Sequence, residues 1–234
     1  KTLLFGTICR YAINQFMTTV SKIDSIAHAR KIIRKNPPAS QLEREKDWDN
    51  ALIWSVVAFA IVWEFTPLFD TDHELTYKSV FWCLFGHYCL TEPLYYCFHR
   101  TMHGYKWIYN ISHYHHHTSI ITEPISGTSH PHIENFGYMC VFSFPFLVPA
   151  FMGCFSYKLI APYMVVFDFL NCVGHCNWEV MPLWVGQYAP FKYMIYTSSY
   201  HSLHHTRFNC NYILFCPIWD YLFNTVHHKT LSLQ

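Results

Sequence analysis

The sequence predicts an all-α integral membrane bundle of about four spans, carrying a histidine-rich cap on the cytosolic side. Three observations predict this fold. The 234 residues are 52% hydrophobic and only 13% charged, the chain contains three long apolar runs, and several of its 17 histidines recur at helical spacing. A chain of this length can build one sizeable domain. Its net charge of +1 gives no indication of a nucleic-acid partner.

Residues 1–50 are predicted to form an N-terminal interfacial or linker region. Apolar side chains recur at roughly helical spacing between Phe5 and Phe16, which favours an interfacial helix or a truncated span. A basic group at residues 30–35 follows, and the pair Pro37 and Pro38 interrupts any helix there.

Residues 51–234 are predicted to form the membrane-embedded domain. The apolar run at residues 51–69 is just long enough to cross a bilayer, and a second run covers residues 77–98. A third run, at residues 137–173, is interrupted by Pro145 and Pro149 and predicts a tight helical hairpin that crosses twice.

The charge pattern predicts the orientation of these spans. The basic group at residues 30–35 is expected in the cytosol, because short cytosolic segments carry an excess of Lys and Arg. The loop at residues 70–76 has neither, as a lumenal loop would. An even number of crossings then separates the histidine motifs, so all of them are predicted to face the cytosol.

Eight histidines form three motifs, one H-x-x-x-H and two H-x-x-H-H. Residues at i, i+3 and i+4 lie on one face of a helix, so each motif directs its imidazoles to one spot. One zinc ion takes about four ligands, and eight imidazoles therefore indicate a two-metal site. The eight are His99 and His103; His113, His116 and His117; and His201, His204 and His205.

Further candidates surround these motifs. His175 follows the third apolar run and is predicted to complete the site, with Asp168 orienting it and Asn171 on the same helical face. His130 is either a ligand or a residue at a helix entry. Glu92 is either near the metal or at the membrane interface, because an ionisable group in an apolar run is usually functional or paired.

The residue types leave the metal and the reaction open. Neutral imidazole suits zinc, copper, iron and nickel. Two irons near a membrane would activate oxygen for attack on a lipid carbon, whereas two zincs would support hydrolysis. The pattern identifies no separate general acid or base. The phenylalanines between residues 142 and 151 either line an acyl channel or serve only in packing.

From about residue 48 to residue 225 the chain resembles the fatty acid hydroxylase/sterol desaturase superfamily. The order of the histidine motifs carries the resemblance to the superfamily. The segments EPLYYCFHRTMH, HYHHHTSIITEPIS, GHCNWE and SSYHSLHHTRFNCNYILFCPIWDYLF, with the pair His130–Pro131, are most similar to plant wax-type very-long-chain aldehyde decarbonylases.

The resemblance implies a multi-pass enzyme of the endoplasmic reticulum membrane with two non-haem irons facing the cytosol. It also implies O2 as oxidant and electrons from NAD(P)H through a reductase and cytochrome b5. The eight motif histidines match the family's metal ligands, and His175 matches a further histidine position. Asn171 stands where hydroxylase relatives carry another histidine, and Gly104 replaces a histidine of the wax-type branch.

The resemblance leaves three activities open. The favoured one converts a very-long-chain aldehyde into an alkane in wax biosynthesis, with loss of the carbonyl carbon. The second is oxidation of a fatty acyl chain or sterol, by a hydroxylase or desaturase. The third is a non-catalytic partner subunit of a wax-forming complex.

Overall fold

The computed structural model describes residues 2–65, 67–69 and 72–230. Within these ranges the regular elements are all helical, apart from one isolated bridge between Lys31 and Trp178. The predicted all-α class is therefore confirmed.

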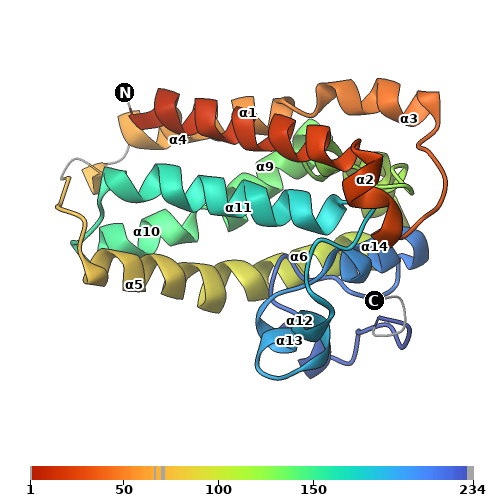
Figure 1. The fold of residues 1–234 in the computed structure, drawn as a ribbon. Coiled ribbons are helices and arrows are strands. Elements are labelled where there is room, and N and C mark those ends of the chain that lie inside the picture. Colours follow the sequence, from red (N-terminus) through yellow and green to blue (C-terminus); the bar gives the residue numbers. More distant parts are fainter. Residues whose placement is uncertain (1, 66, 70–71, 231–234) are drawn as a thin grey trace.

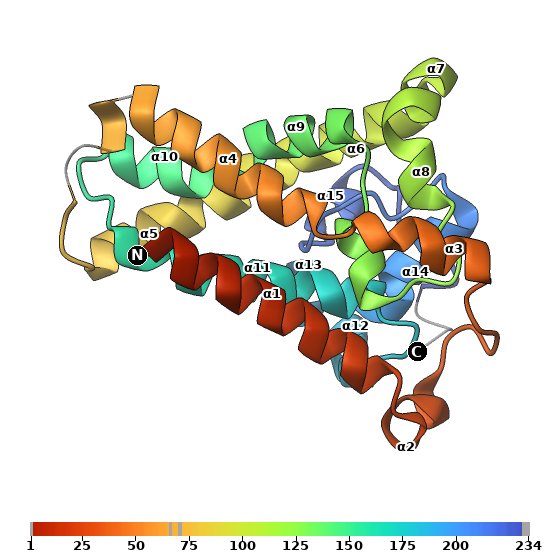
Figure 2. The same ribbon diagram turned by 90° about the horizontal axis from the view of Figure 1, so that it is seen from above.

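Long helices run side by side along one direction, and shorter ones gather at the end that carries α14 (Figures 1 and 2). The α-helices are α1 (Thr2–Ser21), α2 (Asp24–Ala27), α3 (Ala39–Arg44), α4 (Asn50–Phe65), α5 (Tyr77–Phe85), α6 (Glu92–Gly104), α7 (Lys106–Ile108), α8 (Tyr114–His117), α9 (His132–Val141), α10 (Phe144–Phe151), α11 (Ile160–His175), α12 (Leu183–Gln187), α13 (Phe191–Met194), α14 (Ser198–Arg207) and α15 (Ile218–Leu222). The 3-10 turns are η1 (His28–Arg30), η2 (Glu45–Asp47), η3 (Pro67–Phe69), η6 (Pro124–Thr128) and η7 (Tyr157–Leu159), and the π-helical turns are η4 (Gly86–Thr91) and η5 (Tyr109–His113).

None of the helices in the described part of the chain combines the length and the apolar character that crossing a membrane requires. The first predicted span, at residues 51–69, corresponds mainly to α4, which ends at Phe65. Residue 66 of that span lies outside the described residues. The second corresponds to α5, η4 and α6, which follow one another without a break through Pro93.

The third predicted span is arranged differently from a tight hairpin. It forms α9, α10 and α11, in which α11 packs mainly against α1 and α10 packs mainly against α5. Helix α11 pairs with α1 because Arg10 of α1 contacts Asp168 of α11, with Nε 2.6 Å from Oδ2. The spacing of residues within one segment does not reveal such an interaction.

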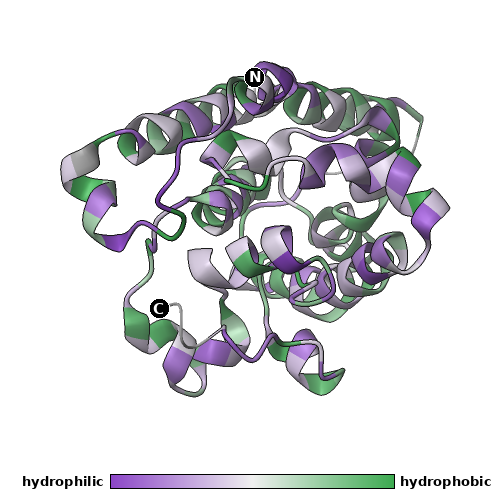
Figure 3. Ribbon diagram, turned by 90° about the vertical axis from the view of Figure 1, so that its right-hand side faces the viewer, coloured by the Kyte–Doolittle hydropathy of each residue, from purple (hydrophilic) through white to green (hydrophobic). Residues whose placement is uncertain are grey.

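Aromatic side chains fill the centre of the bundle. Tyr95 on α6 stacks on Tyr138 of α9, and Phe167 of α11 meets Phe215 edge-on. Seen from the end of the bundle, hydrophilic and hydrophobic residues are mixed along the ribbons (Figure 3). The packing thus holds α6, α9 and α11 together at the end where the histidines lie.

Candidate metal centre

Four segments bring the predicted histidines to one end of the bundle. His99 and His103 are one turn apart on α6, and His175 is the last residue of α11. The π-helical turn η5 ends at His113 and leads into α8, while α14 carries the third motif. π-Helical turns are rare and often occur at functional sites, because the extra residue reorients the side chains that follow.

The nine predicted histidines fall into two groups, within each of which the candidate ligand atoms lie within 4.8 Å of one another. The first histidine group is His99, His103, His113, His117 and His204, and the second histidine group is His116, His175, His201 and His205. The first offers five imidazoles and the second four, which matches the ligand number that one metal ion takes.

Two pairs of neighbours in sequence are divided between the groups. His116 joins the second group and His117 the first, while His204 joins the first and His205 the second. Successive helical residues point about 100° apart, so α8 and α14 each serve both groups. The groups touch, because the His117 and His205 ring centroids are 4.8 Å apart.

Hydrogen bonds orient three rings of the first group. His99 Nδ1 donates to the carbonyl of Tyr212, and His204 Nδ1 donates to the carbonyl of Cys210, both at 2.7 Å. His113 Nδ1 donates to Glu134 Oε1 at 2.6 Å. In a neutral imidazole the other nitrogen then carries a lone pair, so Nε2 of each ring is left as a metal ligand.

The second group is oriented in the same way. His175 Nδ1 donates to the backbone carbonyl of Asn171 at 2.8 Å, and its Nε2 lies 3.0 Å from Nε2 of His201. Gly127 packs so closely here that an added Cβ would lie 2.6 Å from His175 Nδ1. This position therefore has room only for glycine.

The donor set fits a pair of metal ions. Nε2 of His103 and of His204 and both ring nitrogens of His117 and His205 are buried without a hydrogen-bond partner among the described residues. Buried nitrogens are normally paired. Converging imidazole nitrogens with no protein partner are what a metal site requires.

Burial keeps these imidazoles neutral. It lowers the pKa of His175 and of His204 to about 3, and the surrounding imidazoles add to the effect. Burial and the same neighbours hold the pKa of His99, His116 and His205 well below 6.5. Metal binding needs the neutral ring, so the groups do not have to release protons at neutral pH.

Glu92 does not lie among the ligands. Its carboxylate accepts from the backbone N–H of Phe215 at 3.0 Å and lies 3.3 Å from His87 Nε2. Asp220 accepts from the N–H groups of Tyr212 and Ile213. Both acids therefore hold the segment at residues 210–215, whose carbonyls orient the first group. Glu92 supports the imidazoles only indirectly, through this segment.

The expectation that Asp168 orients His175 is wrong. Asp168 accepts two hydrogen bonds from Arg10, because it lies two helical turns from His175 and faces α1. Asn171 orients His175 instead, through its backbone carbonyl, and its side chain donates to Gly127. His130 lies beside the second group, with its ring centroid 4.3 Å from that of His116 and its Nε2 donating to Gly127.

Sequence reasoning missed Glu134. This acid is fully buried, bonds His113 and lies 3.3 Å from His130 Nδ1. Its two imidazole neighbours hold its pKa far below the usual range despite burial. The available signal was its position four residues after His130, in the first turn of α9.

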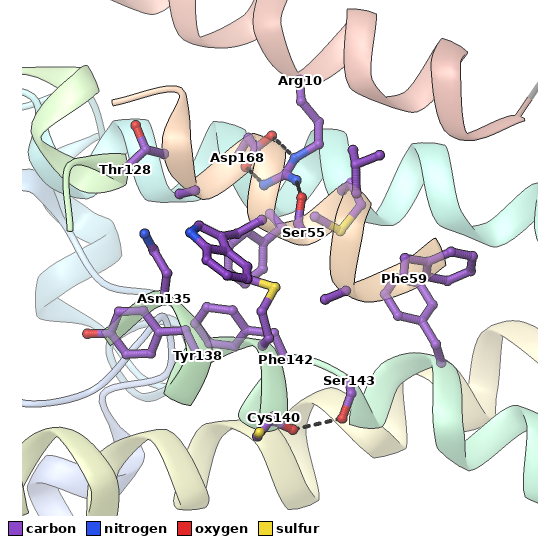
Figure 4. A pocket seen from close by; sticks show the side chains of 18 of the residues that line it. Arg10, Ser55, Phe59, Thr128, Asn135, Tyr138, Cys140, Phe142, Ser143 and Asp168 are labelled. Atoms are coloured by element: carbon purple, nitrogen blue, oxygen red, sulfur yellow. Dashed lines mark hydrogen bonds and ion pairs between the residues drawn. The ribbon is translucent and has the colours of Figure 1, made fainter. Parts of the chain in front are cut away.

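An apolar cavity of about 640 Å³ extends from the second group into the bundle. Figure 4 shows side chains from part of its lining. His116 and His175 line one end, and Phe59, Phe142 and Phe146 line its length. Its wall on α11 runs from Ile160 to His175, a distance of about 22 Å at 1.5 Å per residue. The cavity therefore has the length and the apolar lining that suit a hydrocarbon chain.

Comparison with known proteins agrees with this geometry. The fatty acid hydroxylase profile matches residues 84–225, more than half of the chain. Very-long-chain aldehyde decarbonylase GL1-5 of Oryza sativa subsp. indica is 36% identical over 99% of this chain and 37% of its own length. Very-long-chain aldehyde decarbonylase CER1 of Arabidopsis thaliana is 34% identical over 94% of this chain and 35% of its own.

The chain thus spans little more than a third of the length of these relatives. No solved structure matches it. The family match covers all three histidine motifs, and the relatives extend the similarity over nearly the whole chain. The chain belongs to the fatty acid hydroxylase family.

Proposed function

We propose that this protein is an O2-dependent oxidase of long-chain lipids with two iron ions, which converts a very-long-chain aldehyde into an alkane. The observation that carries the proposal is the pair of adjacent imidazole groups at the end of an apolar cavity. The names of the relatives, very-long-chain aldehyde decarbonylases, support the aldehyde as substrate.

The two histidine groups would hold one iron each. Bound there, the irons would supply the activation of O2, with electrons from NAD(P)H through cytochrome b5 and its reductase. The imidazoles contribute neutral nitrogen ligands whose directions are fixed by Glu134 and by backbone carbonyls. Such outer partners orient metal-binding rings and raise their basicity.

The cavity would bind the hydrocarbon chain and place its oxidised end beside His116 and His175. Phenylalanine and tyrosine side chains line most of its length, and they would exclude water from the reacting carbon. No side chain of the cavity needs to act as a separate acid or base in this proposal.

We further propose that the apolar helices sit in the endoplasmic reticulum membrane, with the histidine end facing the cytosol. Exposed apolar side chains such as Phe5, Ile61 and Phe81 support this placement. Protease tags inserted at residues 36 and 190 should be digested in sealed microsomes, while a tag near Asp72 should survive. The reverse pattern would refute the orientation.

The activity is tested by reconstitution. Purified protein loaded with iron should convert a long-chain aldehyde into an alkane one carbon shorter when supplied with O2, NADH and a cytochrome b5 system. A hydroxylated lipid instead would favour the acyl or sterol oxidase. Activity that persists with zinc and without O2 would overturn the oxidative function.

A non-catalytic partner subunit is the remaining alternative. Such a subunit has no need for oriented metal ligands, whereas here the rings of His99, His113, His175 and His204 are all held by hydrogen bonds. Iron binding without turnover, restored only by a second wax-pathway protein, would favour the partner.

A further inference from the structure

Buried residues line both ends of the cavity. At the histidine end its lining residues Gly127, His130 and His175 are buried. At the far end Phe146 and Ile160 are buried as well, in an aromatic cluster with Phe69. These buried side chains obstruct the entry of a long chain along the cavity axis.

Among the described lining residues, the exposed ones belong to α4 and α9. Ile61 and Val62 of α4 line the cavity and are 52% and 36% exposed, and Phe136 of α9 lines it and is 64% exposed. Cys140, one turn further along α9, lines the cavity and is exposed too. The opening thus lies between α4 and α9.

Helix α4 forms the movable side of this opening. Among the α4 side chains that the structure describes, Leu52 alone is buried. One edge of α4 is tied to the bundle through Ser55, which accepts from Arg10, itself paired with Asp168 (Figure 4). A helix with so little buried surface can shift at small free-energy cost.

A hydrogen bond between described residues spans the opening on the other edge. Trp54 Nε1 donates to His132 Nδ1 at 2.8 Å, and the two rings lie 5.9 Å apart. Trp54 also lines the cavity, as Ser55 and Phe59 do. Breaking this bond would free α4 from α9 beside the bound chain.

We propose that an unbranched alkyl chain enters the cavity sideways between α4 and α9, and that the Trp54–His132 hydrogen bond is the latch of this opening. The identity of the ligand rests on the proposed function. The occupant follows from the cavity, which is apolar and about 22 Å long along α11. About 18 carbons of an alkyl chain fit that length, since C–C bonds near 1.5 Å advance an extended chain by about 1.25 Å per carbon, and the remainder of a longer chain would extend through the opening.

Exchange of radiolabelled octadecanal, measured without O2 on the purified chain, tests the latch. Trp54→Phe keeps an aromatic ring but removes the hydrogen-bond donor. Both the binding rate and the release rate should therefore rise about fivefold, which is the factor that corresponds to the free energy of one hydrogen bond. The equilibrium affinity should stay within about twofold, because bound and free protein lose the same bond. His132→Ala should behave alike, and Trp184→Phe, on exposed α12, should change neither rate.

Alkylation of the folded native chain gives a second test. A bulky maleimide on Cys140 should slow both entry and release, and Cys140→Ser should abolish this effect. Cys97→Ser is the matched control, because Cys97 is also exposed but does not line the cavity. Exchange in this variant should still be slowed by the maleimide.

The outcomes separate the latch from the function. The side entrance would be overturned if Trp54→Phe or His132→Ala raised only the release rate and so lowered the affinity. It would also be overturned if alkylation of Cys140 had no effect on exchange. Native protein that retains no octadecanal would overturn the chain site itself. Normal exchange without alkane formation on reconstitution would overturn only the proposed chemistry.

Discussion

Nε2 of His99 and Nε2 of His113 lie 2.8 Å apart. Each ring already donates from Nδ1, to Tyr212 and to Glu134 respectively, so in their neutral forms both Nε2 atoms present lone pairs to each other. Two lone pairs at this distance repel, whereas a cation bound by both removes the repulsion. A metal ion held by the first group would therefore lie between α6 and η5.

Glu134→Gln should weaken iron binding about 10- to 100-fold, because Glu134 fixes the tautomer and direction of His113. The measurement is iron retained per chain during titration with a chelator. Glu43→Gln, at an exposed carboxylate, should retain iron like the native protein. Equal iron affinity in Glu134→Gln and native protein would show that Glu134 does not support the site.

Single alanine substitutions should distinguish the two histidine groups. His204→Ala removes a ligand of the first group and His205→Ala one of the second, so each should lower bound iron from about two ions per chain toward one. Both should abolish alkane formation, as should His116→Ala. His228→Ala, outside both groups, should keep the native metal content and activity. Loss of all iron from either variant would instead indicate one shared site.

The stability of the protein should depend on Glu123. Burial, with Glu45 nearby, raises the pKa of Glu123 to about 7. Between its ordinary value and pH 7 the native state holds a proton that the unfolded chain releases, so stability is lost as pH rises through 7. Glu123→Gln keeps a side chain able to cap η6 and should be more stable than native protein at pH 8, by roughly 2 kcal/mol after allowance for solvent screening.

Chemical denaturation at pH 5 and pH 8 measures this difference. The gain of Glu123→Gln should be much smaller at pH 5, where the native carboxyl is protonated and the unfolded one is only partly ionised. Glu74→Gln, at an exposed acid, should show no pH-dependent gain. A gain of equal size at both pH values would mean that protonation of Glu123 is not its cause.

The far end of the cavity should set chain length. Phe146→Ala removes a ring that closes the cavity, so the preferred substrate should become longer, at a cost of about 3 kcal/mol in stability. Phe155→Ala is the matched control, because Phe155 belongs to the same buried cluster but does not line the cavity. Competition between aldehydes of graded length measures the preference. An equal shift in both variants would assign it to loosened packing.

The sequence predicts the all-α class and the nine clustered histidines because helical spacing is a local property. It does not predict which histidine belongs to which group, because that depends on how α6, α8, α11 and α14 meet. Asp168 was assigned to His175 by spacing within α11, whereas its partner Arg10 is distant in sequence.

The carbonyls that orient the first group could not be predicted from local sequence patterns either. Those of Cys210 and Tyr212 belong to a nonrepetitive segment in which Phe208 and Asn211 adopt positive φ, of 66° and 57°. Its path depends on the distant carboxylates of Glu92 and Asp220. Periodicity carries no information about such a segment.

The division of neighbouring histidines between the two groups has an evolutionary consequence. Inserting or deleting one residue just before His116 or His204 would rotate the helix by about 100° and aim the wrong imidazole at each ion. Both metal sites would be lost together. An insertion or deletion in these helices therefore cannot remove one site and leave the other intact. Descendants of this fold should therefore tolerate length changes in the connections and reject them within α8 and α14.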